Sequence, residues 1–308
     1  MTLAFEFATA GRIVFGAGAS GSAAEAAAGM GSRLLLVTGS STERAAGLMH
    51  GLSEKGLTWT HLPVSGEPTV DLVTRGAERA AREGIDVVLG MGGGSALDAA
   101  KAIAALATNP GHPLDYLEVI GKGARLEHAG LPAIMIPTTA GTGTEVTRNA
   151  VLASPAHRVK VSLRGPQLLP RLAIVDPDLT LSQPPEVTAW AGLDALTQLI
   201  EPYTTPRAQP MTDALSLEGI RRVARSLRLV FKDGEDRAAR QDMALASLLS
   251  GIAMTNSGLG AVHGFASVLG GRYDIHHGAA CAAVLPITME VNIRALQARA
   301  PGGEGLRR

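Results

Sequence analysis

A run of glycines, Gly90-Met91-Gly92-Gly93-Gly94-Ser95, follows an apolar segment and precedes an alanine-rich one. Glycines let the backbone turn tightly and let a phosphate group approach the backbone amides. The first turn of a following helix would add free N–H groups and the favourable end of the helix dipole. The spacing is not the GxGxxG fingerprint, so by itself it favours a phosphate-binding turn only modestly over an ordinary glycine-rich turn.

A second loop, with the sequence PTTAGTGTE at residues 137–145, also follows a short apolar segment. Its four threonine hydroxyls and two glycines can hydrogen-bond ribose and pyrophosphate oxygens. The plainer alternative is a polar turn whose threonines cap the next helix. Two such loops, each after a strand of one parallel sheet, lie on the same edge, where ligands bind in open α/β sheets.

Another set of residues has the chemistry of metal ligands. Asp194 and Gln198 are four residues apart and share one helical face, while His263 and His277 come later, with His276 beside the second. One carboxylate and two imidazoles suit Fe²⁺ or Zn²⁺, and such an ion polarises a substrate oxygen. Taken singly, Asp194 could stabilise a helix dipole and each histidine could be a hydrogen-bonded core residue. The residues alone therefore leave a metal site and purely structural roles both open.

The order of the predicted elements indicates two halves. Apolar strands are expected at 34–38, 58–62, 86–90 and 133–136, and helices at 41–54, 70–83 and 96–106. This alternation predicts a parallel sheet with helices on both faces. After about residue 180 only helical periodicity follows, at 185–204, 208–230, 237–255 and 279–297. We therefore expect an α/β, Rossmann-like domain over 1–180 and an all-α, metal-binding domain over 181–308.

Composition narrows the function classes. The chain has 308 residues, 46% hydrophobic and 18% charged, and Lys plus Arg equals Asp plus Glu at 28 each. A balanced charge gives no reason to expect a nucleic-acid or membrane partner. Cys281 is the single cysteine, which excludes an intrachain disulfide, and no uninterrupted apolar run approaches the roughly 18 residues of a membrane span. We predict a cytoplasmic protein.

Together these motifs resemble a known family. GMGGGSALDAAK, IPTTAGTGTEVT, KVSL followed by LAIVDP, GLDALTQLIEPY, GLGAVHG and HGAACAAVLP occur in the order and spacing of iron-containing (group III) alcohol dehydrogenases, over residues 5–292. The resemblance implies a dehydroquinate synthase-like fold and a homodimer. It also implies metal-dependent hydride transfer between NAD or NADP and a small alcohol or aldehyde, with Fe²⁺ or Zn²⁺. Glycerol dehydrogenases and dehydroquinate synthases share the fold, so the fold alone does not fix the reaction.

The resemblance also implies roles for particular residues. The expected metal ligands are Asp194, Gln198, His263 and His277. The catalytic residues would be Asp194, His263 and His277, with His276 passing protons. The expected cofactor-binding residues are Gly39, Ser40, Thr42, Gly92, Gly93, Gly94, Ser95, Asp98, Thr138, Thr139, Thr142 and Lys160. Within this set, residues 92–95 would bind pyrophosphate, Asp98 would shape the nicotinamide side and Lys160 would reach the ribose or nicotinamide.

The chain departs from the family pattern at several positions. Gln198 stands where a histidine ligand is usual, which weakens the expected metal affinity, and Ser267 replaces a histidine proposed to pass protons. His276 replaces a usual proline, and we expect it to substitute in part for that histidine. Gly39 stands where many relatives carry an aspartate, so nothing repels a 2′-phosphate and NADP stays open. We also expect the chain to lack the family's last helical part.

Two other functions remain open at this point. A keto or enone acid reductase of the maleylacetate reductase type would need basic groups for the acid, for which Arg148 and Arg272 are candidates. A non-catalytic nucleotide-binding remnant is the other alternative, because of Gln198 and the short C-terminus.

Overall fold

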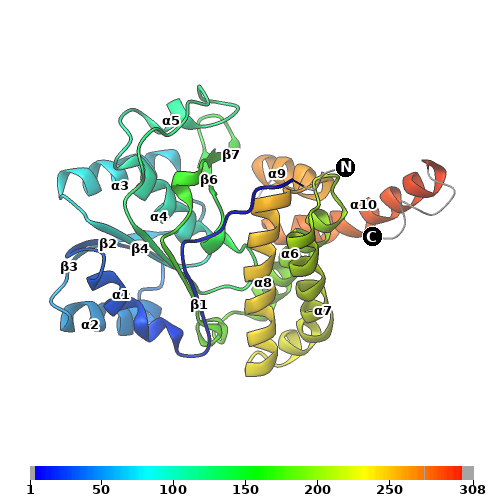
Figure 1. Ribbon diagram of the computed structural model, residues 1–308, viewed down its shortest axis with the longest axis horizontal. Helices are drawn as coiled ribbons and strands as arrows, with labels where there is room; N and C mark the ends of the chain where they lie inside the picture. Colours follow the sequence, from blue (N-terminus) through cyan, green and yellow to red (C-terminus); the bar gives the residue numbers. More distant parts are fainter. Residues whose placement is uncertain (1–3, 274, 300–308) are drawn as a thin grey trace.

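The computed structural model describes residues 4–273 and 275–299 (Figure 1). Its first half is built on a six-stranded sheet in which all paired strands are parallel, with strand order β1-β8-β5-β4-β2-β3. The strands are β1 (Ile13–Phe15), β2 (Arg33–Gly39), β3 (Thr58–Val64), β4 (Val87–Gly92), β5 (Ala133–Pro137) and β8 (Leu172–Val175). Because β4 and β5 are parallel neighbours, the two loops that follow them leave the same edge of the sheet.

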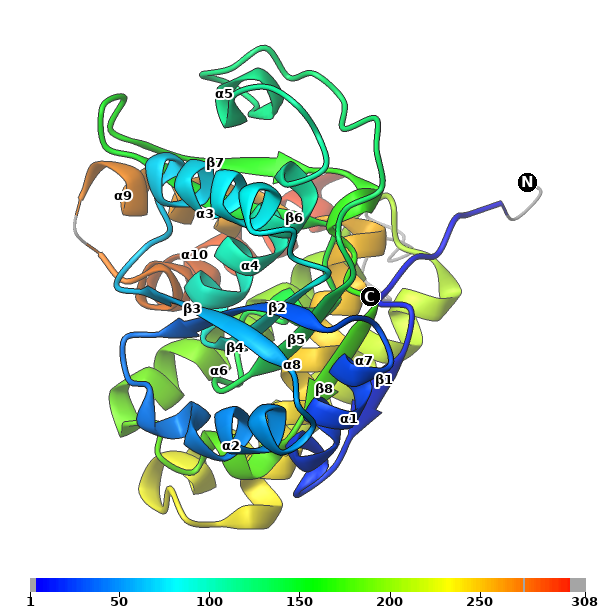
Figure 2. The ribbon, with the colours of Figure 1, turned by 90° about the vertical axis from the view of Figure 1, so that its left-hand side faces the viewer.

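The central strands are apolar throughout because helices cover both faces of the sheet. Leu34 and Leu36 of β2 pack in a cluster with α1 (Ala23–Ala28) and α2 (Ala46–Glu54). The alternate residues, Leu35 and Val37, pack in another cluster with α3 (Val70–Arg82) and α4 (Gly94–Leu106). Figure 2 shows the sheet between these two layers.

Helix α4 carries the glycine turn and is buried along its length. Every residue from Ala96 to Leu106 is buried, and the many alanines let this helix pack closely on the sheet. Its other side packs on an antiparallel hairpin of β6 (Asn149–Ser154) and β7 (Val159–Arg164). A short helix, α5 (Pro113–Tyr116), lies in the long connection to β5.

The second half consists of helices. They are α6 (Pro185–Thr204), α7 (Pro210–Lys232), α8 (Arg237–Ser257), α9 (Ala261–Arg272) and α10 (His277–Arg299). α6 and α7 each begin with a proline, whose fixed φ and missing N–H suit the first turn of a helix. α6, α7 and α8 pack against one another, α10 packs on α6 and α9, and the far end of α10 extends away from the body (Figure 1).

The two halves meet with almost no space between their backbones. A Cβ added to Gly141 would lie 2.7 Å from the Cβ of Ala191 in α6, and one added to Gly143 would lie 2.5 Å from the Cα of Gly251 in α8. Gly143 also has a φ of +59°, which side chains other than glycine rarely adopt. These loop glycines therefore fix the threonine loop against α6 and α8.

The structure confirms the predicted fold class, a Rossmann-like α/β part followed by helices. Several details differ from the expectation. The helix expected from residue 41 begins as a 3₁₀ turn over Glu43–Ala45, because the chain needs a tight turn after β2 before α2 starts. The β6–β7 hairpin and α9 were not predicted, and α9 has no clear amphipathic pattern. The domain division at residues 180 and 181 stays a prediction, with β8 ending at Val175 and α6 starting at Pro185.

By length and composition alone, α10 is the one helix in the described ranges that would be able to cross a membrane; 17% of its most apolar window is buried. Cys281 and Leu285 in its first half are buried, whereas Ile287 and Val291 are exposed. One such helix is weak evidence of a membrane span, since a core helix passes the same test.

Candidate active site

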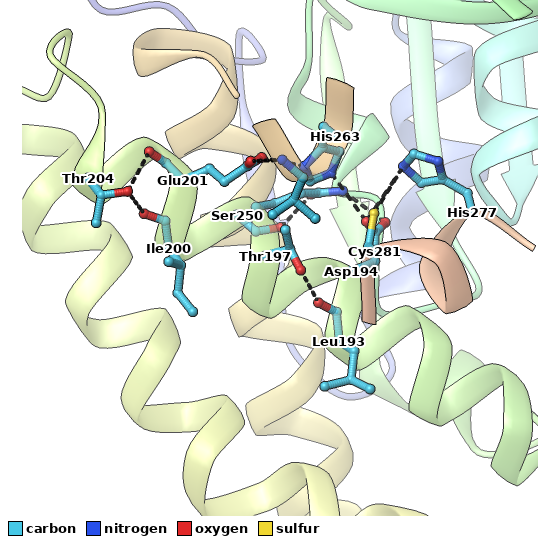
Figure 3. Close-up of polar contacts among 12 residues, drawn as sticks. Leu193, Asp194, Thr197, Ile200, Glu201, Thr204, Ser250, His263, His277 and Cys281 are labelled. Carbon is cyan, nitrogen blue, oxygen red and sulfur yellow. Dashed lines mark hydrogen bonds and ion pairs between the residues drawn. The ribbon is translucent and has the colours of Figure 1, made fainter. Parts of the chain in front are cut away.

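Four donor side chains converge in the helical half (Figure 3). Asp194, His263, His277 and Cys281 each offer one ligand atom, and these atoms all lie within 4.8 Å of one another. Asp194 Oδ1 lies 3.4 Å from His263 Nε2 and 3.8 Å from His277 Nε2. His277 Nε2 lies 3.7 Å from Cys281 Sγ. The arrangement brings together the three residues predicted as the charged and imidazole ligands, and it adds a thiol that the sequence analysis did not connect with the metal.

Three helices supply these donors. Asp194 is in the middle of α6, His263 is in the first turn of α9, and His277 opens α10 with Cys281 one turn further on. Gly278 lets α10 approach α6, because a Cβ at this position would lie 2.3 Å from the Trp190 carbonyl oxygen. The cluster therefore depends on the packing of helices that are distant in sequence.

Two buried atoms of the cluster, Asp194 Oδ1 and His263 Nε2, have no hydrogen bond of normal geometry within residues 4–273 and 275–299. They lie 3.4 Å from each other, and their residues are 3% and 7% exposed. A buried polar atom without a partner costs about 1–3 kcal/mol, so native structures rarely retain one unless something else binds it. The two atoms face each other across a gap suited to a cation, and the donor set therefore fits a divalent metal ion.

Glu201 contacts the ring nitrogen of His263 that points away from the cluster, and the sequence analysis did not identify this residue. Its Oε2 lies 2.6 Å from His263 Nδ1, and its Oε1 accepts a hydrogen bond from the Val262 N–H at 2.7 Å. A carboxylate that holds the second ring nitrogen fixes the orientation of a ligating histidine. Burial lowers the pKa of His263, but the neighbouring Asp194, Cys281 and Glu201 outweigh it and raise this pKa well above the usual value. Glu201 lies seven residues after Asp194 on the same helical face, and this spacing could have identified it.

Gln198 lies next to Asp194, as the helical spacing predicted, but its amide is already engaged. Nε2 donates to Asp194 Oδ2 at 2.9 Å, and Oε1 accepts from Ser250 Oγ at 3.0 Å. The amide nitrogen therefore faces the carboxylate. As placed, Gln198 orients Asp194, and its role as a ligand stays a prediction.

His276, the expected proton carrier, lies beside the cluster. Its ring stacks on Trp190 with ring centroids 4.5 Å apart. Burial lowers the pKa of His276, so the ring is neutral at pH 7 and able to accept a proton. Neutral charge and a position next to His277 are compatible with the predicted role.

A cavity of about 230 Å³ lies at the carboxyl edge of the sheet. Six of the predicted cofactor-binding residues line it, namely Gly39, Ser40, Gly92, Gly93, Thr138 and Thr139. Ser41, Arg44, Ala45 and Met91 complete the lining. The structure thus brings together the ends of β2, β4 and β5, as the parallel sheet required.

The three glycines after β4 have different surroundings. A Cβ at Gly92 would lie 2.7 Å from the Cβ of Ala96, and one at Gly94 would lie 2.9 Å from Thr142 Cγ2. At Gly93 the nearest atoms belong to Thr139 at 3.6 Å, which is ordinary contact distance. Gly92 and Gly94 are therefore required by packing, whereas Gly93 leaves room at the cavity that a phosphate can occupy.

Asp98 and Lys101 lie below this cavity and tie α4 to the threonine loop. Asp98 accepts hydrogen bonds from Thr144 Oγ1 at 3.1 Å and from the Val151 N–H at 3.0 Å. Lys101, 1% exposed, donates to the Thr144 and Thr147 carbonyl oxygens at 2.9 and 3.2 Å. The observed contacts of Asp98 are thus structural, and its predicted contact with the cofactor stays a prediction.

The remaining predicted residues lie around the two sites. Thr42 precedes the 3₁₀ turn after β2, and Ser95 is in the first turn of α4, next in sequence to Gly94, which lies against Thr142. β7 packs against α9, and the Nζ of Lys160 in β7 pairs with Oε1 of Glu67, in the loop between β3 and α3, at 3.0 Å. The charge of Lys160 acts on the pKa of both His276 and His277, which places it between the cofactor half and the cluster.

Comparison with known proteins agrees with this geometry. The family model described as iron-containing alcohol dehydrogenase matches residues 10–177. The chain belongs to the iron-containing alcohol dehydrogenase family. A second model, for the C-terminal part of the Fe-containing alcohol dehydrogenase family, matches residues 188–301. The expectation that the family's C-terminal helical part is lacking is therefore corrected, because the helical half of this chain is that part.

Several relatives in the family are similar over long stretches. The long-chain-alcohol dehydrogenase 1 of Geobacillus thermodenitrificans is 48% identical over 68% of this chain and 52% of its own length. The choline dehydrogenase of Bacillus subtilis is 40% identical over 91% of this chain and 71% of its own. The solved structure of a 1,3-propanediol oxidoreductase superimposes with a TM-score of 0.89 at 35% identity, covering 95% of this chain and 77% of that one. The chain thus spans about half to three quarters of the length of these relatives.

Proposed function

We propose that this chain is a metal-dependent oxidoreductase that transfers a hydride between NAD(P)(H) and a small alcohol or aldehyde. The observation that carries the proposal is the buried donor cluster in which Asp194 Oδ1 and His263 Nε2 lack a hydrogen bond to any described residue. A non-catalytic protein would have little reason to keep two facing, unsatisfied polar atoms in a core.

We expect the α/β half to bind the cofactor and the helical half to bind the metal ion. Gly93, Thr138 and Thr139 line the cavity that would hold the cofactor phosphates, and the cofactor supplies the hydride. Asp194, His263 and His277 would hold a divalent ion, which supplies Lewis-acid chemistry when bound. We expect the neutral imidazole of His276 to accept the alcohol proton during oxidation and to return it during reduction.

The alternative of a keto or enone acid reductase has less support. Arg148 is exposed and lies 3.7 Å from Glu6 Oε1, and Arg272 is exposed at the end of α9. These positions give neither arginine a described contact with the donor cluster. The remnant alternative is disfavoured because the cluster offers a full donor set despite Gln198.

The test is metal reconstitution. Protein purified without chelators is stripped with EDTA, reloaded with Fe²⁺, Zn²⁺ or Co²⁺, and assayed with NADH and NADPH on a panel of small aldehydes and keto acids. We expect no turnover by the metal-free protein and turnover of an aldehyde after reloading. Turnover that is equal with and without metal would refute the proposal, and activity confined to keto acids would favour the reductase alternative. A homodimer in the cytoplasm remains our prediction, and size-exclusion chromatography with light scattering tests its assembly.

A further inference from the structure

We infer that Cys281 is a ligand of the metal ion and replaces the imidazole that Gln198 does not provide. This inference deepens the proposed function and rests on its metal site. It concerns the single cysteine of the chain, which is 0% exposed and has no disulfide partner.

The spacing of the donor atoms matches one ion with four protein ligands. Ligands at about 2.0–2.3 Å from a zinc-like ion, placed at tetrahedral angles, lie about 3.3–3.6 Å from one another. The observed separations are 3.4 Å between Asp194 and His263, 3.8 Å between Asp194 and His277, and 3.7 Å between His277 and Cys281. All four donor atoms lie within 4.8 Å of one another, so shifts of about an ångström or less would bring them onto one ion.

Helix geometry presents the thiol to the ion. Cys281 follows His277 by four residues, so the two side chains lie on one face of α10, above each other. This face packs on α6, where Asp194 lies, and the Cys281 side chain points to the same space as the His277 ring (Figure 3). The thiol sulfur of Cys281 therefore lies within 4.8 Å of the other three donor atoms.

Gln198 is the competing fourth ligand, and its hydrogen bonds argue against it. The amide nitrogen, which cannot bind a cation, is directed at Asp194 Oδ2 at 2.9 Å. Reversing the amide would place its oxygen 2.9 Å from that carboxylate oxygen, where two acceptors repel each other. Gln198 is thus a positioning residue that holds Asp194, whereas Cys281 supplies the donor atom.

A thiolate ligand changes the metal preference. Sulfur is a softer donor than imidazole or carboxylate oxygen, so a site with one thiolate favours Zn²⁺ and Co²⁺ over a hard ion such as Mn²⁺. The same site with Gln198 as a ligand would have an oxygen donor instead, and its preference for Zn²⁺ and Co²⁺ over Mn²⁺ would be smaller.

Cobalt spectroscopy on the full chain tests the assignment. Metal-free wild-type protein is titrated with Co²⁺, and the near-ultraviolet thiolate-to-cobalt charge-transfer absorption is recorded together with binding by calorimetry. We expect this band in the wild type, its loss in Cys281→Ser, and at least a tenfold fall in Co²⁺ affinity, equal to about 1.4 kcal/mol. The Zn²⁺ affinity should fall more than the Mn²⁺ affinity. Gln198→Ala, the matched control, should keep the band.

The outcomes separate the two proposals. Co²⁺ binding by the wild type without a thiolate band would overturn the role of Cys281 while leaving the metal site intact. Unchanged Co²⁺ affinity in Cys281→Ser would do the same. Absence of any Co²⁺ binding by the wild type would overturn both the metal site and this inference. The wild-type spectrum decides the question even if Cys281→Ser does not fold, because the chain has only one cysteine.

Discussion

The cofactor cavity and the donor cluster are built in opposite ways. The cavity consists of strand ends and glycines, and its key position, Gly93, works because a side chain is absent. The cluster consists of side chains from three helices. Each of these side chains needs a partner that fixes its orientation, as Glu201 fixes the ring of His263. A cavity made by backbone is encoded by local sequence, whereas a cluster made by side chains depends on distant contacts.

The largest expected effect is the loss of an imidazole from the cluster. His263→Ala should reduce metal affinity by more than about 100-fold and abolish turnover, because a ligand contributes more than the groups that orient it. Glu201→Gln, which keeps the size of the side chain but removes its charge, should cost about 10–100-fold. Calorimetry with Zn²⁺ measures both. If His263→Ala binds Zn²⁺ as the wild type does, the cluster is not a metal site.

A second prediction concerns the charged network that joins α7 and α8. Asp242 accepts hydrogen bonds from Arg222, Arg225 and Ser226 at 2.5–2.8 Å. The bond from Arg225 contributes most to lowering the pKa of Asp242 from 3.8 to about 2. Because the folded-state pKa is the lower one, the ionised form stabilises the fold above about pH 4, and this contribution disappears as the pH falls toward 2. Asp242→Asn should therefore lower the free energy of unfolding by about 2 kcal/mol at pH 7 and by much less at pH 2.

Urea denaturation of both proteins at the two pH values provides the check. A deficit of the same size at pH 2 and pH 7 would show that the charge of Asp242 does not stabilise the helical half.

The backbone-built cavity should respond to an added side chain without losing its fold. Gly93→Val places its branches near Thr139, where a Cβ has room, but fills the space for a phosphate. We expect NAD(P)H affinity to fall at least tenfold, or about 1.4 kcal/mol, with unchanged Co²⁺ binding. Gly94→Ala is the contrast, because its Cβ would meet Thr142 at 2.9 Å and should destabilise the turn. If fluorescence titration shows that Gly93→Val binds NAD(P)H with full affinity, the cofactor does not bind in this cavity.

The smallest expected effect is on cofactor choice. No atom lies within 4 Å of a Cβ built on Gly39, so Gly39→Asp should be accommodated at the rim of the cavity. An aspartate there bonds the adenosine ribose and repels a 2′-phosphate, so the NADP/NAD ratio of kcat/KM should fall several-fold. A ratio that stays constant or rises would show that residue 39 does not face the ribose.

The two regions also differ in what the sequence could predict. The strands around residues 34–37 (LLLV) and 86–90 (DVVLG) were predictable because both of their faces are buried. Gly93 was predictable as a cofactor-binding residue from its place directly after β4. Glu201 and Cys281 were not identified as site residues, since their roles depend on how α9 and α10 pack on α6. The burial of Lys101 was not predictable from the sequence either, because its carbonyl partners lie more than 40 residues away along the chain.

The central claim is that the two regions act on one substrate, with hydride passing from the cofactor to a carbonyl carbon only when the donor cluster is loaded. The direct measurement uses NAD(P)H deuterated at C4 and an aldehyde that the enzyme reduces, with mass spectrometry of the alcohol product. We predict one deuterium at the carbinol carbon with metal-loaded protein and no deuterated alcohol with metal-free protein. Deuterium transfer at equal rates without metal would contradict the account, as would binding of cofactor and metal with no transfer to any aldehyde.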